Sequence, residues 1–152
     1  LVIFVFNFFG LLFLGDGGAY LISFVPGHTL INFSNNNNEF VSPYFTACML
    51  WYPAYENLFS ITRKKFNNKS ATKADKTHLH QLLYIFFKNK LFYSDKVTNT
   101  LTGFTLVFFN LIVLLIAAKF FNDSKNLILL LLISITFYNL TYYYLKKNIR
   151  NN

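Results

Sequence analysis

The chain has 152 residues, which at roughly 150 residues per domain is enough for one domain. Charged residues make up only 13% of it, about half of the usual share, whereas apolar residues make up 54%, and the formal net charge is +8. This composition excludes a disordered chain, a collagen and a coiled coil, and it argues against an ordinary soluble globule, because so apolar a chain cannot cover itself with polar surface. We therefore expect an all-α integral membrane protein.

The first two apolar stretches predict membrane helices. The chain begins inside an apolar run, and we interpret residues 1–14 as the end of a span that a fragment boundary has cut. No basic segment precedes this run and no small-residue cleavage site follows it, which argues against a signal peptide. Residues 17–33 are also free of charge, but Pro26 and Gly27 should kink or break a helix there.

Three further spans are predicted downstream. Residues 40–59 are long enough if Glu56 lies at the membrane interface. Residues 97–118 and 126–145 carry no charge and qualify by length alone, because a bilayer core needs about 20 apolar residues in a helix. The prediction is therefore one partial and four complete transmembrane helices.

The lysines and arginines are unevenly distributed over the predicted loops. Nine of the fourteen lie in a loop of about residues 61–96 and three follow the last span, whereas the loops 34–39 and 119–125 contain none and two. Since basic residues favour the cytoplasmic side, we expect the basic loop and the C-terminus to be cytoplasmic. Counting back over two more spans places Asp16 on the same membrane face.

Asp16, in the segment LFLGDGGAY, is the first residue that could carry chemistry. Gly17 and Gly18 leave the backbone uncovered, so that a phosphate or a metal could approach closely, and the next helix would begin here with an N-terminus that favours anions. A carboxylate at this place could hold a hard cation such as Mg²⁺. A helix cap followed by turn glycines explains the same residues.

A second candidate is the group Asp75, His78 and His80 in KADKTHLHQLL. Both imidazoles face one side if the segment is extended, and they diverge if it is helical. The pair could bind a metal, although no third or fourth ligand is evident nearby, or it could contact a pyrophosphate or a base. A solvated basic loop with incidental histidines is the alternative.

A third candidate is the end of the predicted span 40–59. Glu56 lies about two helical turns before Arg63 and would pair with a basic residue or line a polar cavity. Arg63 and Lys64 would equally serve as anchors at the cytoplasmic membrane surface.

Several enzyme classes leave no signature in the sequence. It contains no GxxxxGK[ST], GxGxxG, HExxH or GxSxG motif. No recognised binding module accompanies the basic loop, so we expect no nucleic-acid partner.

Three segments together resemble the polyprenyl-phosphate N-acetylhexosamine-1-phosphate transferases. FLGDGGAYLISF (13–24) looks like the GD(A/G)G motif that precedes a span in that family. YPAYENLFSITRK (52–64) is similar to the family's P-x-(F/Y)-(D/E)-T-L…RR span end, and SATKADKTHLHQLL (70–83) looks like its SPF-x-x-D-x-x-HLHHRL loop. The segments occur in family order, and two spans follow them, as in the branch that makes undecaprenyl-linked GlcNAc.

The resemblance implies an integral membrane enzyme of the bacterial inner membrane. Such an enzyme transfers a sugar-1-phosphate from a UDP-sugar to undecaprenyl phosphate and releases UMP at the cytoplasmic face, at the start of cell-envelope polysaccharide synthesis. It requires Mg²⁺. We expect UDP-GlcNAc as the donor, and UDP-MurNAc-pentapeptide is a weaker alternative.

The resemblance also implies roles for individual residues. Asp16 matches the carboxylate assigned to Mg²⁺ or to catalysis, and His78 and His80 match the loop histidines that contact the nucleotide diphosphate. The residues assigned to the substrate region are Gly17, Gly18, the basic residue Arg63 and the loop acid Asp75, whose role is structural.

Two departures from the family pattern keep alternatives open. Gln81 stands where the family has a third loop histidine, and no Asp-Asp pair occurs in the chain. We expect a missing N-terminal part to carry the paired aspartates and this fragment alone to be inactive. The alternatives are an inactive paralogue and a non-enzymatic polytopic membrane protein, such as a transporter or an accessory subunit, in which Asp16 and Glu56 are intramembrane polar groups.

Overall fold

The computed structural model describes residues 6, 15–66, 68, 77–91 and 94–151, and every regular element in these ranges is an α-helix. The helices are α2 (Gly15–Asn36), α3 (Pro43–Met49), α4 (Trp51–Phe66), α5 (Leu79–Leu91), α6 (Asp95–Lys119) and α7 (Ser124–Asn151). The predicted all-α class is confirmed for the described residues.

Short polar side chains start three of these helices. The Ser42 hydroxyl accepts a hydrogen bond from the backbone N–H of Tyr44 and so caps α3, and Ser94 caps α6 in the same way. Asp123 accepts hydrogen bonds from the backbone N–H groups of Lys125 and Asn126 at the start of α7. These caps satisfy backbone donors that the first turn of a helix leaves without partners.

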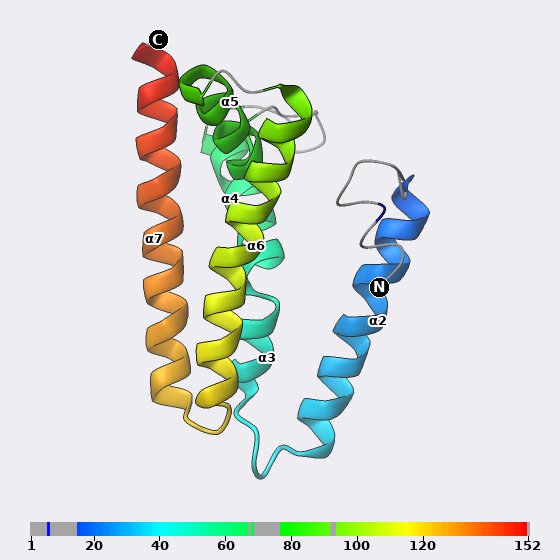
Figure 1. The fold of residues 1–152 in the computed structure, drawn as a ribbon. Helices are drawn as coiled ribbons and strands as arrows, with labels where there is room; N and C mark the ends of the chain where they lie inside the picture. The colour runs from blue at the N-terminus through cyan, green and yellow to red at the C-terminus, as the bar shows by residue number, and fades with distance from the viewer. Residues whose placement is uncertain (1–5, 7–14, 67, 69–76, 92–93, 152) are drawn as a thin grey trace.

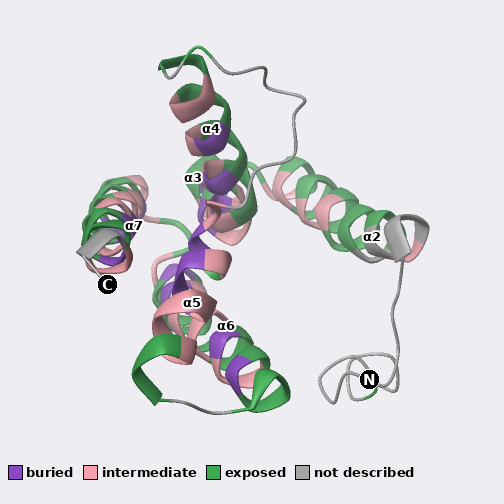
Figure 2. Ribbon diagram, turned by 90° about the horizontal axis from the view of Figure 1, so that it is seen from above, coloured by how far each residue is buried: buried purple, intermediate pink, exposed green. Residues whose placement is uncertain are grey.

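The helices α3, α6 and α7 run side by side, and α5 packs on α6 and α7 near the C-terminus of the chain (Figure 1). Helix α4 continues from α3 towards the same end and diverges from α6 (Figure 2). The turn between α6 and α7 is short, so that these two helices are antiparallel neighbours. In contrast, α2 stands apart and approaches the other helices only where it leads into α3 (Figures 1 and 2).

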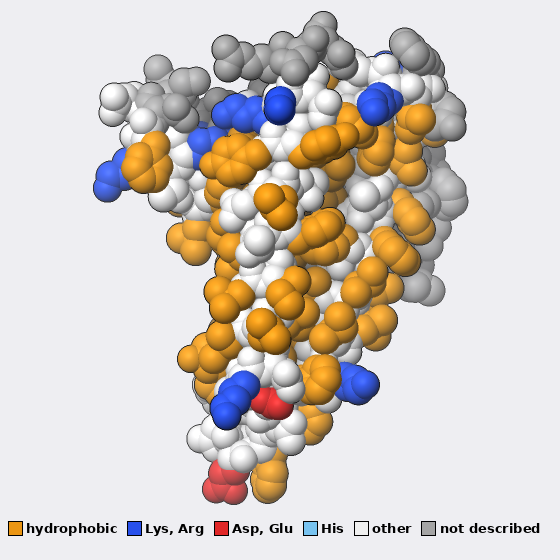
Figure 3. Space-filling model, turned by 90° about the vertical axis from the view of Figure 1, so that its left-hand side faces the viewer, with side chains coloured by type: hydrophobic (Ala, Val, Ile, Leu, Met, Phe, Trp, Pro, Cys, Tyr) orange, Lys and Arg blue, Asp and Glu red, His pale blue; other side chains and the backbone are white. Residues whose placement is uncertain are grey.

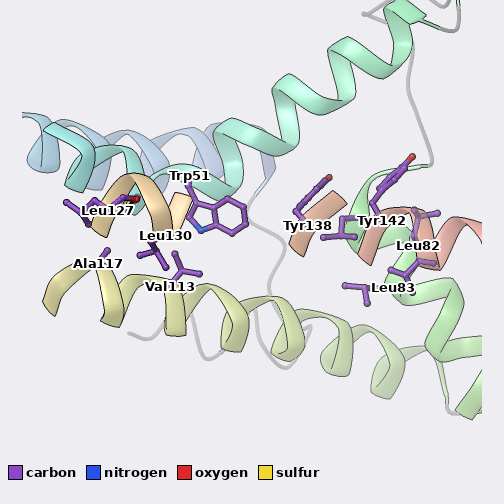
Figure 4. Close-up of a cluster of buried hydrophobic side chains, with 12 residues drawn as sticks. Trp51, Leu82, Leu83, Val113, Ala117, Leu127, Leu130, Tyr138 and Tyr142 are labelled. Carbon is purple, nitrogen blue, oxygen red and sulfur yellow. Dashed lines mark hydrogen bonds between the residues drawn. The ribbon is translucent and has the colours of Figure 1, made fainter. Parts of the chain in front are cut away.

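The buried apolar side chains form one cluster along this bundle, part of which Figure 4 labels. Within it, Trp51 packs edge to face on Phe109, with a distance of 5.9 Å between the ring centroids. Leu82 and Leu83 bring α5 into the cluster. The labelled members are Trp51, Leu82, Leu83, Val113, Ala117, Leu127, Leu130, Tyr138 and Tyr142.

Two helices, α6 and α7, are long and apolar enough to cross a membrane. Only 17% and 22% of their apolar windows are buried, whereas the core helix of a soluble protein would be mostly buried. The large apolar side chains that they expose include Phe104, Val107, Phe108, Leu111, Leu115, Leu129, Leu132, Ile133 and Leu140. Figure 3 shows how apolar side chains cover the middle of this face, with charged side chains towards both ends.

The predicted span 40–59 does not form one helix. The chain leaves the helical pattern at Leu50, between α3 and α4. Pro53 explains the break, because proline has no N–H to bond back to the preceding turn but is tolerated in the first turn of a new helix. The second helix then continues past residue 59 to Phe66 and includes Arg63.

Of the kink or break predicted at Pro26 and Gly27, the break is wrong, because α2 continues through these residues from Gly15 to Asn36. A proline inside a helix removes one backbone hydrogen bond, and the bonds on either side can keep the helix continuous. Two of the four complete spans predicted from the sequence thus correspond to helices that are long and apolar enough to cross a bilayer, namely α6 and α7.

Basic side chains gather at one end of the bundle, which we call the basic end. Here α4 and α7 end, α6 begins and α5 lies across them (Figure 1). The described basic residues of these segments are Arg63, Lys64, Lys65, Lys88, Lys90, Lys96, Lys146 and Lys147. The opposite end has two lysines together with Glu39 and Asp123. The uneven distribution of basic residues along the sequence therefore makes one end of the bundle much more positive than the other.

Candidate functional site

One face of α4 carries the polar residues of the candidate site. Glu56, Ser60 and Arg63 follow one another at intervals of four and three residues, which places them in one row along the helix. Glu56 and Ser60 are buried, with 9% and 6% of their surfaces exposed. A carboxylate this deeply buried needs hydrogen-bond partners, because desolvation otherwise makes its charge costly.

Glu56 has three such partners. Its Oε2 atom accepts a hydrogen bond of 2.6 Å from the hydroxyl of Tyr138 in α7. Its Oε1 atom lies 2.9 Å from Nδ1 of His78 and accepts a hydrogen bond of 3.2 Å from the backbone N–H of Leu79. The carboxylate therefore connects α4 with α7 and with the beginning of α5.

His78 immediately precedes α5 and caps it. The His78 carbonyl accepts hydrogen bonds from the N–H groups of Gln81 and Leu82, while the side chain of Gln81 accepts one of 3.2 Å from the His78 N–H. The bond from the His78 N–H to the Gln81 side chain is one half of a capping box; the His78 side chain does not supply the other half, because it bonds Glu56 instead. Gln81 thus holds the start of α5, a role that a neutral amide can perform.

The rings of His78 and His80 lie on the same side and stack, with 5.7 Å between their centroids and 16° between their planes. They do not diverge, because His78 precedes the helix and only His80 belongs to its first turn. His80 keeps part of its surface exposed. Burial of the remainder lowers the pKa of its imidazole, the Glu56 carboxylate acts in the opposite direction, and His78 adds a further lowering, so that His80 is mostly neutral near pH 7.

Arg63 faces the interior of the bundle. Its Nη1 donates hydrogen bonds to the carbonyl oxygen of Thr77, at 2.6 Å, and to the hydroxyl of Tyr142, at 2.5 Å. Its guanidinium carbon also lies 5.4 Å from the ring centroid of Tyr142 and 5.8 Å from that of Phe59. These contacts favour a structural and site role for Arg63 over that of a membrane-surface anchor.

Two tyrosines of α7 complete the arrangement. Tyr138 and Tyr142 are one helical turn apart, each is only 1% exposed, and they contact Glu56 and Arg63 respectively. We call Glu56, Arg63, His78, Tyr138 and Tyr142 the α4–α7 polar cluster.

Sequence reasoning named Glu56 as a polar group that would pair with a basic residue, and it did not place Tyr138 or Tyr142 in a site. Tyr142 was as compatible with an aromatic belt at the membrane surface as with a buried position. The available signal was the spacing of four residues between two hydroxyl-bearing rings in a span, which puts both hydroxyls on one helix face.

The remaining candidate residues are only partly described by the structure. Asp16 lies in the first turn of α2, which begins apart from α4–α7 in both ribbon views (Figures 1 and 2), and Gly18 lies in the same turn. The side chain of Asp16, the surroundings of Gly17 and the whole of Asp75 lie outside the described residues. The structure thus brings together Arg63, His78 and His80.

The described residues do not by themselves fit a metal ion. Within residues 15–66, 77–91 and 94–151, no three histidine, cysteine, aspartate or glutamate side chains come together as ligands. Both oxygens of Glu56 accept hydrogen bonds from protein groups. Arg63 and His78 of the cluster, together with the neighbouring His80, do offer a guanidinium and two imidazoles at the basic end, which suits binding of an anion such as a phosphate.

No known protein family has a model that matches this chain, and comparisons with curated proteins and with solved structures give no match either.

Proposed function

We propose that the protein containing this chain transfers a sugar-1-phosphate, with GlcNAc-1-phosphate as the first choice, from a UDP-sugar to undecaprenyl phosphate and releases UMP. The reaction takes place at the cytoplasmic face of a bacterial inner membrane and begins the synthesis of a cell-envelope polysaccharide. The contact between Glu56 and His78 is the observation that carries the proposal. It joins two of the three family-like segments, which the sequence alone only places in order.

The chemistry of the cluster suits this reaction. A pyrophosphate that meets a lipid phosphate gathers several negative charges in one place, so catalysis depends on positioning and on charge neutralisation. Arg63 supplies a permanent positive charge beside Thr77 and His78, and the lysines of the basic end add positive potential. Since Nδ1 of His78 bonds to Glu56, its Nε2 is the nitrogen left for the substrate, and in the protonated ring it would donate a hydrogen bond to a phosphate oxygen.

The bilayer supplies the lipid substrate and sets the proposed topology. In the finer proposal α2 and the pair α3–α4 also cross the membrane, whereas the span predicted for residues 1–14 lies almost wholly outside the described residues. The pair α3–α4 is interrupted at Leu50. Interrupted helices are tolerated in membranes where protein packs against the break.

Mg²⁺ enters this proposal only through the resemblance. Asp16 would be the carboxylate that meets the ion, because the described residues alone do not offer a ligand set. No step proposed here for Arg63 or His78 depends on the ion.

The test is an assay of UMP release by membranes that contain the protein encoded by the complete reading frame. With UDP-GlcNAc, Mg²⁺ and undecaprenyl phosphate, we expect release that requires the lipid. His78→Ala should lower the rate about 100-fold or more, and Asp16→Asn should abolish it. His28→Gln is the matched control, because His28 is an exposed histidine of α2 with no contact to the cluster.

Two results would overturn parts of this proposal. Full activity of Asp16→Asn would show that the assignment of Asp16 is wrong. A folded protein that releases no UMP from any UDP-amino sugar would favour the inactive paralogue or the non-enzymatic membrane protein.

A further inference from the structure

The two groups of the cluster that would face phosphate, Arg63 and His78, are both held in place by tyrosines of α7, the former directly and the latter through Glu56. On α4, Glu56 and Arg63 are separated by about two turns, and on α7 the two tyrosines that contact them are separated by one turn. We propose that Tyr138 of α7, acting through Glu56, is a positioning residue that fixes the ring and the tautomer of His78. This inference rests on the proposed function for its catalytic meaning, but its structural part stands without it.

The hydrogen bonds define the tautomer. A carboxylate only accepts hydrogen bonds, so the bond between Glu56 Oε1 and His78 Nδ1 requires a proton on Nδ1. In the neutral ring Nε2 then carries the lone pair, and in the protonated ring both nitrogens carry protons. In either state Nε2 is the atom available to the substrate.

The carboxylate itself is held in place by groups from two other segments. The Tyr138 hydroxyl takes Oε2 at 2.6 Å, and the Leu79 N–H takes Oε1 at 3.2 Å, so that the carboxylate plane cannot turn without loss of a bond. In metal sites, groups that orient a histidine in this way change affinity or activity by about 10-fold to 100-fold when they are removed. We expect an effect of the same size here.

The ring of Tyr138 also packs in the core, and this packing must be distinguished from the hydrogen bond that the hydroxyl donates to Glu56. It packs edge to face on Tyr55, at 5.0 Å between centroids, and on Phe59, at 5.4 Å. Tyr138→Phe keeps this packing and removes only the donor to Glu56. The substitution therefore distinguishes a positioning role from a packing role.

The same helix also holds the arginine. Tyr142 lies under the guanidinium of Arg63 and accepts a hydrogen bond from it, and the other acceptor of that Nη1 is the carbonyl of Thr77, the residue before His78. The cation and the imidazole are thereby kept side by side. We infer that α7, although it carries none of the family-like motifs, sets the geometry of the site.

The first experiment does not depend on activity. The chain contains three histidines, so ¹⁵N-histidine labelling of the protein in a lipid nanodisc gives few signals, and those of His78 are identified by their loss in His78→Gln. Above the pKa of the ring, we expect a protonated Nδ1 and an unprotonated Nε2. Glu56→Gln should shift His78 towards the opposite tautomer or a mixture, whereas Tyr143→Phe, which alters an exposed tyrosine of α7, should leave the spectrum unchanged.

The second experiment measures the steady-state kinetics of UMP release. Tyr138→Phe should lower kcat about 10-fold and leave KM for the UDP-sugar within about twofold, because positioning of His78 is needed most in the transition state. Tyr143→Phe should leave both constants unchanged. Equal constants for Tyr138→Phe and the wild type would overturn the positioning role.

The two failures are distinguishable. If no UDP-sugar is a substrate, the proposed function falls, and the ¹⁵N spectra alone decide whether Glu56 sets the tautomer. If UMP is released but His78 carries its proton on Nε2, or if its spectrum ignores Glu56→Gln, the positioning inference falls and the proposed function stands.

Discussion

Glu56 connects three helices through a single side chain. It accepts hydrogen bonds from Tyr138, Leu79 and His78, and only 11% of its side-chain surface is exposed. The contribution of Glu56 to stability follows from the hydrogen-bond donors that would lose their acceptor if it were removed. A hydroxyl, a backbone N–H and an imidazole would all lose their acceptor in the interior of the bundle.

Glu56→Leu should therefore destabilise the protein by about 2–4 kcal/mol, the range typical of buried donors left without a partner. The free energy of unfolding in mixed detergent micelles measures this change. Glu39→Leu is the control, because Glu39 is exposed at the opposite end, and a change of less than about 0.5 kcal/mol is expected there. Equal effects of the two substitutions would show that the Glu56 bonds contribute nothing to stability.

Gln81 has a structural role that its place in the sequence does not reveal. In the sequence it is only a departure from a family-like run of histidines. In the structure its side chain accepts a hydrogen bond from the His78 N–H at the start of α5. Gln81 is thus a poor argument for an inactive paralogue, because the local structure gives the amide a task of its own.

The helices α6 and α7 expose rather than bury most of their apolar surface. This is expected of elements whose solvent is lipid, since hydrocarbon removes the cost of exposed apolar side chains. Val107 lies near the middle of α6 and is 57% exposed. A substitution at Val107 therefore tests whether this face of α6 contacts lipid.

Val107→Lys should weaken membrane insertion of α6 by about 2.5–3.5 kcal/mol, the cost of a lysine at the centre of a span. A glycosylation-mapping insertion assay gives this number. Phe66→Lys introduces the same charge at the exposed end of α4, and it should have no such effect. Unchanged insertion of Val107→Lys would contradict a lipid-facing α6.

Some elements follow from the sequence and others do not, for identifiable physical reasons. Residues 97–118 and 126–145 predicted α6 and α7 correctly, because length and the absence of charge are sufficient for such helices. The break at Pro26 and the continuity of the span 40–59 were predicted wrongly, since whether a helix continues past a proline depends on neighbouring helices. The contact of Glu56 with His78 spans 22 residues and a loop, so no local pattern can specify it.

At the scale of the whole molecule, the basic end collects most of the positive charge, together with the candidate site. This end carries Arg63 and the loop histidines, and the C-terminal helix ends there too (Figure 1). Because basic residues are retained on the cytoplasmic side, the account places the whole basic end in the cytoplasm.

Cysteine labelling tests this topology. In a Cys48→Ala background, Lys147→Cys should react with a membrane-impermeant maleimide only after the membrane is opened, and Glu39→Cys should react from outside in intact cells. Both positions are exposed in the structure. The reverse pattern would place the basic end, and the site with it, on the wrong side for a cytoplasmic nucleotide sugar.

The most direct measurement of the central claim is formation of the lipid product. The protein encoded by the complete reading frame is reconstituted with undecaprenyl phosphate, Mg²⁺ and UDP-GlcNAc labelled in the sugar, and label in the lipid fraction is compared with UMP. The account predicts equal amounts of lipid-linked sugar and UMP, almost none of either in His78→Ala, and unchanged amounts in His28→Gln. A folded protein that gives no labelled lipid from UDP-GlcNAc or any other UDP-amino sugar would contradict it.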